Sequence, residues 1–107
     1  MNPTEFSQLP LEISFEAMKL IDGVVIVDCR TKDEFDSGHL EGALNLPLQQ
    51  VCIQNEDLPC NQDDAIAVYC RSGNRSFTFA TYLRSIGYPN CQSIEGGIET
   101  WGEREKC

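Results

Sequence analysis

The sequence predicts an α/β domain in which helices cover both faces of a parallel sheet. Two continuous apolar runs, residues 24–27 and 65–69, have the composition of strands buried on both sides. A segment with helical signals follows each run, and strands that alternate with helices are typical of parallel sheets. The chain has 107 residues, the size of one ordinary domain, so we expect a single domain over residues 1–107.

The segment before the first buried strand carries one clear helix signal. Residues 1–12 contain two prolines and are predicted to be an irregular lead-in. Ser14 is a suitable N-cap, so a short helix is expected over residues 15–21, ended by the Asp22-Gly23 pair.

Three short elements are expected between the two buried strands. Thr31 and Glu34 have the spacing of a capping box, which predicts a short helix that ends at Gly38. Residues 43–46 are predicted to form a strand stopped by the following proline, and residues 48–55 a helix.

The C-terminal part of the chain continues the alternation. Residues 76–86 place apolar side chains on one helical face, and a glycine and a proline follow them. Residues 91–94 are expected to form a short strand, Gly96-Gly97 a turn, and residues 98–105 a last helix.

Composition excludes several classes of function. The chain carries 8 basic and 17 acidic residues, a net charge of -9, and such a surface repels nucleic acid. No apolar run approaches the ~18–20 residues of a membrane span, and the first residues do not resemble a secretory signal. We therefore expect a cytoplasmic protein without nucleic-acid or membrane partners.

The six cysteines are interpreted mainly as reduced thiols. They are too far apart in sequence for the close ligand pairs of zinc sites or for a dithiol C-x-x-C motif, and the chain has one histidine. No metal and no cofactor are therefore expected. The cysteines are Cys29, Cys52, Cys60, Cys70, Cys91 and Cys107.

Cys70 is the candidate nucleophile. It follows a buried strand directly, and ligands of parallel sheets bind beyond the carboxyl ends of strands. The next residues lead into a helix N-terminus, whose free amides and partial positive charge favour a thiolate. Glycine, serine and arginine in this loop add inward-turned amides, hydroxyl donors and full positive charge. These residues are Arg71, Ser72, Gly73, Asn74, Arg75 and Ser76.

No obvious general base accompanies this cysteine. His39 is the single histidine, and it is expected to be a hydrogen-bonded structural residue. A thiolate that is already ionised needs no base, and it is suited to attack on sulfur through a mixed-sulfur intermediate. The loop amides would then hold an anionic sulfur or oxygen, as phosphate-binding loops do.

Several motifs together resemble those of single-domain rhodaneses, the thiosulfate sulfurtransferases. Residues 70–76, Cys-Arg-Ser-Gly-Asn-Arg-Ser, resemble the active-site loop of that family, and residues 25–30 resemble its Asp-x-Arg strand end. Residues 34–47 and 95–101 resemble its first and closing signatures, although family members often carry proline or isoleucine at Glu41. The resemblance implies a three-layer rhodanese-like domain with a central, mostly parallel five-stranded sheet and helices on both faces.

The resemblance also implies a reaction. The Cys70 thiolate would attack the outer sulfur of thiosulfate, release sulfite and carry the sulfur as a persulfide. Cyanide, a thiol or a thioredoxin-like protein would accept it. Arg71 and Arg75 would bind the anionic donor. Asp28 and Arg30 are interpreted as scaffold, with Asp28 able to pair with a loop arginine.

Two further interpretations concern residues beside the reacting cysteine. Cys29 also stands at a strand end and is interpreted as a buried bystander, with resolution of the persulfide as a disulfide as the alternative. Gly96, Gly97 and Trp101 are interpreted as turn and packing residues rather than substrate contacts.

Three alternative functions share the same sequence features. A phosphatase or arsenate reductase of the related fold has one more residue between cysteine and arginine than Cys70-x4-Arg75. A non-catalytic regulatory module would usually lack the cysteine. A persulfide carrier for a protein partner would use the same site.

Overall fold

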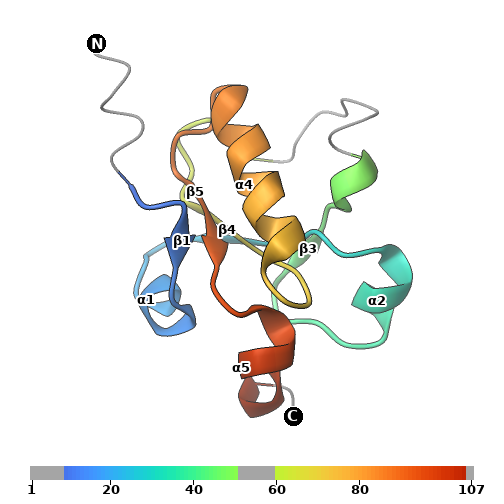
Figure 1. The fold of residues 1–107 in the computed structure, drawn as a ribbon. Helices are drawn as coiled ribbons and strands as arrows, with labels where there is room; N and C mark the ends of the chain where they lie inside the picture. The colour runs from blue at the N-terminus through green and yellow to red at the C-terminus, as the bar shows by residue number, and fades with distance from the viewer. Residues whose placement is uncertain (1–8, 51–59, 106–107) are drawn as a thin grey trace.

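Five parallel strands form one sheet in the order β1-β5-β4-β2-β3 (Figure 1). The structure, a computed structural model, describes residues 9–50 and 60–105, with residues 102–105 described by their backbone alone. The strands are β1 (Glu12–Ile13), β2 (Val25–Asp28), β3 (Leu44–Asn45), β4 (Ile66–Tyr69) and β5 (Cys91–Ile94). The four pairings between them are parallel, which confirms the predicted α/β class.

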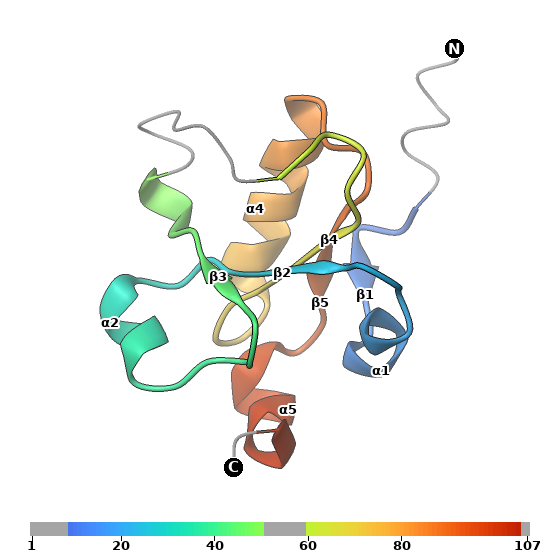
Figure 2. The same ribbon diagram turned by 180° about the vertical axis from the view of Figure 1, so that it is seen from behind.

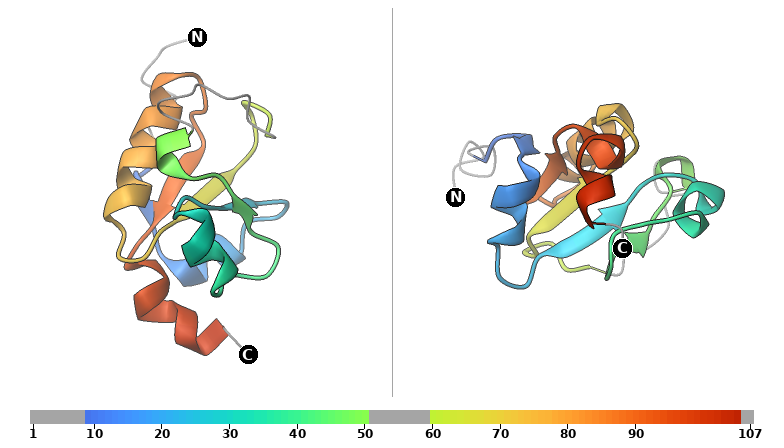
Figure 3. Two further views of the ribbon diagram at one scale, coloured as in Figure 1. Left: turned by 90° about the vertical axis from the view of Figure 1, so that its right-hand side faces the viewer. Right: turned by 90° about the horizontal axis from the view of Figure 1, so that it is seen from below.

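Helices cover both faces of this sheet, as predicted. The helices are α1 (Phe15–Lys19), α2 (Lys32–Asp36), α4 (Asn74–Ser85) and α5 (Gly97–Glu105). The view from behind places α4 on the far side of the strands and α1 on the near side, and the turned views agree (Figures 2 and 3). Phe79 and Leu83 of α4 belong to one core cluster, and Phe15 and Trp101, which stack at 4.5 Å, belong to the other.

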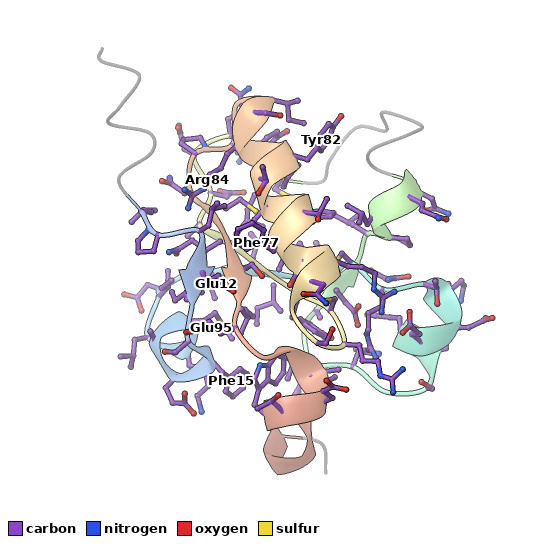
Figure 4. The ribbon with its side chains drawn as sticks, in the orientation of Figure 1. Glu12, Phe15, Phe77, Tyr82, Arg84 and Glu95 are labelled. Atoms are coloured by element: carbon purple, nitrogen blue, oxygen red, sulfur yellow. The ribbon has the colours of Figure 1, made fainter. Side chains whose placement is uncertain are left out.

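Strand β1 corrects the prediction that residues 1–12 are an irregular lead-in. Glu12 is in register with Ser93 of β5, and the amide of Glu95 donates to the carbonyl of Ile13 over 2.9 Å. Figure 4 shows Glu12 on β1 and Glu95 beyond the end of β5. An edge strand of two residues is too short to show an alternating pattern, which explains why the sequence did not reveal it.

The local signals for the short helices are confirmed, with small shifts at their ends. The hydroxyl of Ser14 accepts a hydrogen bond from the amide of Ala17 over 3.1 Å, and the Thr31–Glu34 capping box is complete. Residues 48–50 are helical, and the rest of the helix expected over 48–55 lies outside the described residues. No helix in the described part of the chain is long and apolar enough to span a membrane.

Candidate active site

Strand β4 and helix α4 place Cys70 at the carboxyl end of the sheet. All four residues of β4 are buried, and Cys70 directly follows the strand on the face that α4 covers. The chain then turns through Gly73, whose φ of +104° lies in the region that glycine tolerates best, and enters α4. The turn aims the first free amides of α4 back toward the end of β4, as the sequence predicted.

Hydrogen-bond donors surround the sulfur of Cys70. The amides of Gly73 and Ser76 donate to Sγ over 3.1 and 3.4 Å, and the hydroxyl of Ser76 lies 3.5 Å from it. That hydroxyl is itself held 2.7 Å from the hydroxyl of Ser93 on β5 and 3.2 Å from the carbonyl of Gly73. The donors are therefore fixed before any substrate arrives.

These contacts make Cys70 an acidic thiol. The hydrogen bond from the Cys29 thiol has the largest effect, and the hydrogen bonds from Ser76 and Gly73 add to it. Together they overcome the opposing effect of burial and lower the pKa of Cys70 to about 4. A sulfur with this pKa is a thiolate at neutral pH.

Cys29 occupies the matching position at the end of the neighbouring strand. Asp28 of β2 is in register with Tyr69 of β4, and the Cys29 amide donates to the carbonyl of Tyr69 over 3.0 Å. Cys29 and Cys70 thus follow paired residues, and both belong to the core cluster under α4. The hydrogen bond to Cys70 and burial hold the pKa of Cys29 well above its usual range.

Cys29 is buried, as the sequence suggested, but it also interacts with the sulfur of Cys70, which the bystander interpretation missed. The available signal was that both cysteines stand at strand ends. Using this signal requires knowing that the two strands are neighbours, and a strand order of this kind does not follow from chain order alone.

The two loop arginines differ in their surroundings. Arg75 makes two hydrogen bonds to the carboxylate of Glu34, at 2.8 and 3.0 Å, and this contact lowers the pKa of Glu34 to about 2. Arg71 is exposed and lies 3.5 Å from Glu99. Glu34 and Glu99 were not among the predicted site residues. Binding of an anionic donor by either arginine stays a prediction.

The N-terminus of α5 supports the loop from behind. The amides of Ile98 and Glu99 donate to the carbonyls of Cys70 and Arg71 over 2.9 and 3.0 Å. Gly97 has a φ of +67°, and a side chain there would overlap the Arg71 carbonyl. A turn was predicted at Gly96-Gly97, whereas the structure has the turn at Glu95-Gly96 and begins α5 at Gly97, and the contact with the loop was not predicted.

Asp28 and Arg30 form a buried pair on the scaffold, which corrects the suggestion that Asp28 pairs with a loop arginine. The carboxylate of Asp28 accepts from Nη2 of Arg30 at 2.7 Å and from Nε at 3.0 Å. The same Nη2 also donates to the carbonyl of Gly38 over 2.6 Å. A guanidinium two residues along the chain reaches this carboxylate more easily than a loop arginine that Glu34 already holds.

The remaining predicted residues lie around this centre. Nδ1 of His39 is 2.8 Å from the carbonyl of Phe35 and its ring stacks on Phe35, so its observed contacts are local and structural. Ser72 and Asn74 are exposed on the loop, where their substrate-binding role stays a prediction. Within the described residues, no three His, Cys, Asp or Glu side chains are grouped to hold a metal ion.

The family model of the rhodanese-like domain matches residues 14–104. This chain belongs to the rhodanese-like family. The rhodanese-like domain is 37% identical to the thiosulfate sulfurtransferase GlpE of Pseudomonas putida strain F1 over 100 residues, which cover 92% of this chain and 86% of the relative. It is 36% identical to a sulfurtransferase of Allochromatium vinosum over 80 residues, 75% of this chain and 73% of the relative.

Solved structures show the same fold. A protein of Staphylococcus saprophyticus superposes with a TM-score of 0.78 at 26% identity, over 92% of this chain and 99% of that one. The human single-domain sulfurtransferase superposes with a TM-score of 0.76 at 22% identity, over 91% of this chain and 99% of that one. The relatives and the family identify the rhodanese-like domain as a sulfurtransferase, which takes sulfur from a donor and passes it to an acceptor.

Proposed function

We propose that this domain is a thiosulfate sulfurtransferase that carries the transferred sulfur as a persulfide on Cys70. The observation that carries the proposal is the pair of amides, of Gly73 and Ser76, that donate to the sulfur of Cys70 and, with the Cys29 thiol, lower its pKa. The thiolate attacks the outer sulfur of thiosulfate and forms a new S–S bond. The original S–S bond breaks, and sulfite leaves with its electron pair, so no oxidant is needed.

The same loop suits the product of this step. The loop amides that stabilise the thiolate are close enough to stabilise the negative charge of a persulfide, which is displaced outward by one sulfur atom. Arg71 is better placed than Arg75 to attract an anionic donor, because its pair with Glu99 is exposed and spans 3.5 Å, whereas Glu34 holds Arg75 by two short hydrogen bonds. Cyanide in an assay, or a thiol or thioredoxin-like protein, would then accept the sulfur.

The pairing of Arg75 also bears on the phosphatase and arsenate reductase alternative. A phosphate-transfer site of this kind needs its arginine to clamp phosphate oxygens, whereas Arg75 makes a two-point contact with Glu34. The loop is also one residue shorter than in those enzymes. Both features favour transfer of a single sulfur atom over transfer of a tetrahedral oxyanion.

Three activities test the proposal. The purified chain should release sulfite from thiosulfate, form thiocyanate when cyanide is present, and leave p-nitrophenyl phosphate intact. Cys70→Ser should lose sulfite release and thiocyanate formation while keeping its fold by circular dichroism, because the nucleophile is gone. Thiocyanate formation by the Cys70→Ser variant would show that another cysteine carries the sulfur.

A further inference from the structure

The end of the sheet holds two thiols rather than one. Neighbouring strands lie about 4.8 Å apart, so cysteines that follow paired residues have a backbone separation within the range that disulfides span. Asp28 and Tyr69 are such a pair, and Cys29 and Cys70 come next. Both side chains lie on the α4 face and both are free thiols in the structure.

The loop amides and the Cys29 thiol approach the sulfur of Cys70 from different sides. The loop amides of Gly73 and Ser76 contact Sγ of Cys70 from the α4 side, where the added sulfur of a persulfide would be held. The Cys29 thiol approaches the same Sγ from the neighbouring strand β2, whose last residue Asp28 is in register with Tyr69. A nucleophile at Cys29 would therefore meet the inner sulfur of the persulfide, with the outer sulfur as the leaving group.

We infer that Cys29 is an internal acceptor that resolves the Cys70 persulfide and releases its outer sulfur as hydrosulfide. This inference rests on the proposed persulfide function. Sγ of Cys29 bonds to Sγ of Cys70, and the bond between Cys70 and the outer sulfur breaks. The thiol proton of Cys29 leaves with the outer sulfur as HS⁻. The two cysteine sulfurs are oxidised to a disulfide and the outer sulfur is reduced, so the step balances without a further reactant.

Loading of Cys70 favours ionisation of Cys29, while burial continues to oppose it. In the resting site, the hydrogen bond to Cys70 and the negative charges of Cys70 and Asp28 raise the pKa of Cys29. Once sulfur is bound, Sγ of Cys70 is no longer an anion, and the charge lies one atom farther away. Two of the effects that keep Cys29 protonated are then reduced, while Arg75 continues to favour its ionised form.

A cavity beside Cys29 gives the disulfide a route to a reductant. Its volume is about 300 Å³ and it is lined by Cys29, Thr31, Pro47, Leu48, Gln49 and Arg75. A cysteine side chain of a dithiol protein that reaches into this cavity would attack the sulfur of Cys29 and expel Cys70. Cys70 is the better leaving group because the loop amides stabilise its thiolate, and a thiol of lower pKa leaves faster. The second thiol of the reductant would then release Cys29.

The complete cycle is a dithiol-dependent reduction of thiosulfate. Thiosulfate and a protein dithiol are consumed, and sulfite, hydrosulfide and a protein disulfide are formed. A sulfurtransferase without the second thiol would instead hold its persulfide until an external acceptor arrives. Cys29 therefore determines whether sulfur leaves this site as free sulfide when no acceptor is present.

A single-turnover experiment tests this inference. The reduced full chain is mixed with stoichiometric thiosulfate under nitrogen without an acceptor, and sulfite, sulfide and intact mass are measured. The wild type should release one equivalent each of sulfite and sulfide and lose about 2 Da, with a Cys29–Cys70 disulfide in its peptide map. A sample without thiosulfate should stay reduced.

Two variants separate the roles. Cys29→Ser keeps a hydrogen-bond donor but has no sulfur, so it should release sulfite with less than about a tenfold loss of rate, form no sulfide and gain about 32 Da. Cys91→Ser removes another buried thiol of the same core cluster and should match the wild type.

The outcomes distinguish the two proposals. A wild type that releases sulfite, gains about 32 Da and forms no sulfide would overturn the role of Cys29 and leave the persulfide function intact. Sulfide release by Cys29→Ser equal to that of the wild type would also overturn it. A wild type that releases no sulfite would overturn both proposals. The mass of the wild type decides the matter even if Cys29→Ser does not fold.

Discussion

Cys70 and Cys91 are both buried on the α4 face of the sheet, yet their thiols have opposite acidities. Cys91 begins β5 and is in register with Ile66 at the amino end of β4, whereas Cys70 follows the carboxyl end of β4. The exposed fraction is 0% for Cys91 and 1% for Cys70. Burial raises the pKa of Cys91 to about 12, and hydrogen bonds lower that of Cys70 to about 4.

The comparison identifies which feature produces a thiolate. Cys91 has an arginine in its surroundings, because Nε of Arg84 donates to the Cys91 carbonyl over 2.9 Å and its charge lowers the thiol pKa in part. Burial still prevails there. At Cys70 the main lowering effects are hydrogen bonds made directly to the sulfur. Hydrogen bonds donated directly to the sulfur, more than a nearby arginine, therefore account for the difference in thiol pKa between Cys70 and Cys91.

The largest expected difference is in alkylation. Labelling of Cys70 by iodoacetamide, followed peptide by peptide, should have its midpoint near pH 4 and stay level above it, since the thiolate is the reactive form. At pH 7, a pKa of about 12 leaves Cys91 with a thiolate fraction about five orders of magnitude below one. An alkylation midpoint of Cys70 near pH ~8.5, the ordinary pKa of a cysteine, would contradict the proposed effect of the donors on Cys70.

A smaller effect is expected when the support behind the loop is disturbed. Gly97→Ala should displace the Arg71 carbonyl, reduce thiocyanate formation by roughly tenfold to a hundredfold and raise the alkylation midpoint of Cys70. It should also lower the free energy of unfolding by about 1–3 kcal/mol in urea denaturation.

Gly23→Ala is the matched control for this variant. Gly23 has a φ of +69°, close to that of Gly97, but no atom lies within 4 Å of the added Cβ. Gly23→Ala should lower the free energy of unfolding by about 1–2 kcal/mol through backbone strain and should keep full thiocyanate formation. Equal activity of the two variants would mean that α5 does not position the loop.

The smallest effect is expected at the ion pair beside the loop. Glu34→Gln keeps an oxygen for the capping box but loses the charge facing Arg75, and both side chains are about one-third exposed. The expected loss of unfolding free energy is at most about 1 kcal/mol at pH 7. Because the pKa of Glu34 is lowered from 4.5 to about 2, its contribution is complete above pH 4.5 and disappears as the pH falls toward 2.

Asp36→Asn on the same helix serves as the control. Asp36 pairs with the highly exposed Lys32, so loss of the Asp36 charge should leave the urea midpoint unchanged both at pH 7 and near pH 2. A loss in Asp36→Asn equal to that in Glu34→Gln would assign the effect to the charge of helix α2 rather than to Arg75.

The sequence predicts the parts of the site that are continuous along the chain. The strand before Cys70, the glycine turn and the start of α4 each have a local signal, and the structure has all three. The contacts made by Cys29, Glu34 and the first turn of α5 come from segments far from the loop in sequence. These contacts depend on strand order and on packing at the end of the sheet, and single residue patterns do not carry that information.

The edge strand shows the same limit. Two residues of β1 join the sheet because the carbonyls of Leu11 and Ile13 meet free amides of β5 and the residue after it. Nothing in the composition of residues 11–13 distinguishes them from the rest of the lead-in, so the pairing becomes visible only when β5 is in place.

The contact between α5 and the reactive loop also has a consequence for how the protein matures. A ribosome makes residues 70–76 well before residues 97–99, whose amides hold the carbonyls of Cys70 and Arg71. A nascent chain that has emerged only as far as β5 therefore lacks the support behind Cys70. The backbone support behind residues 70 and 71 is therefore complete only after α5 has been made and has folded, later than the loop itself.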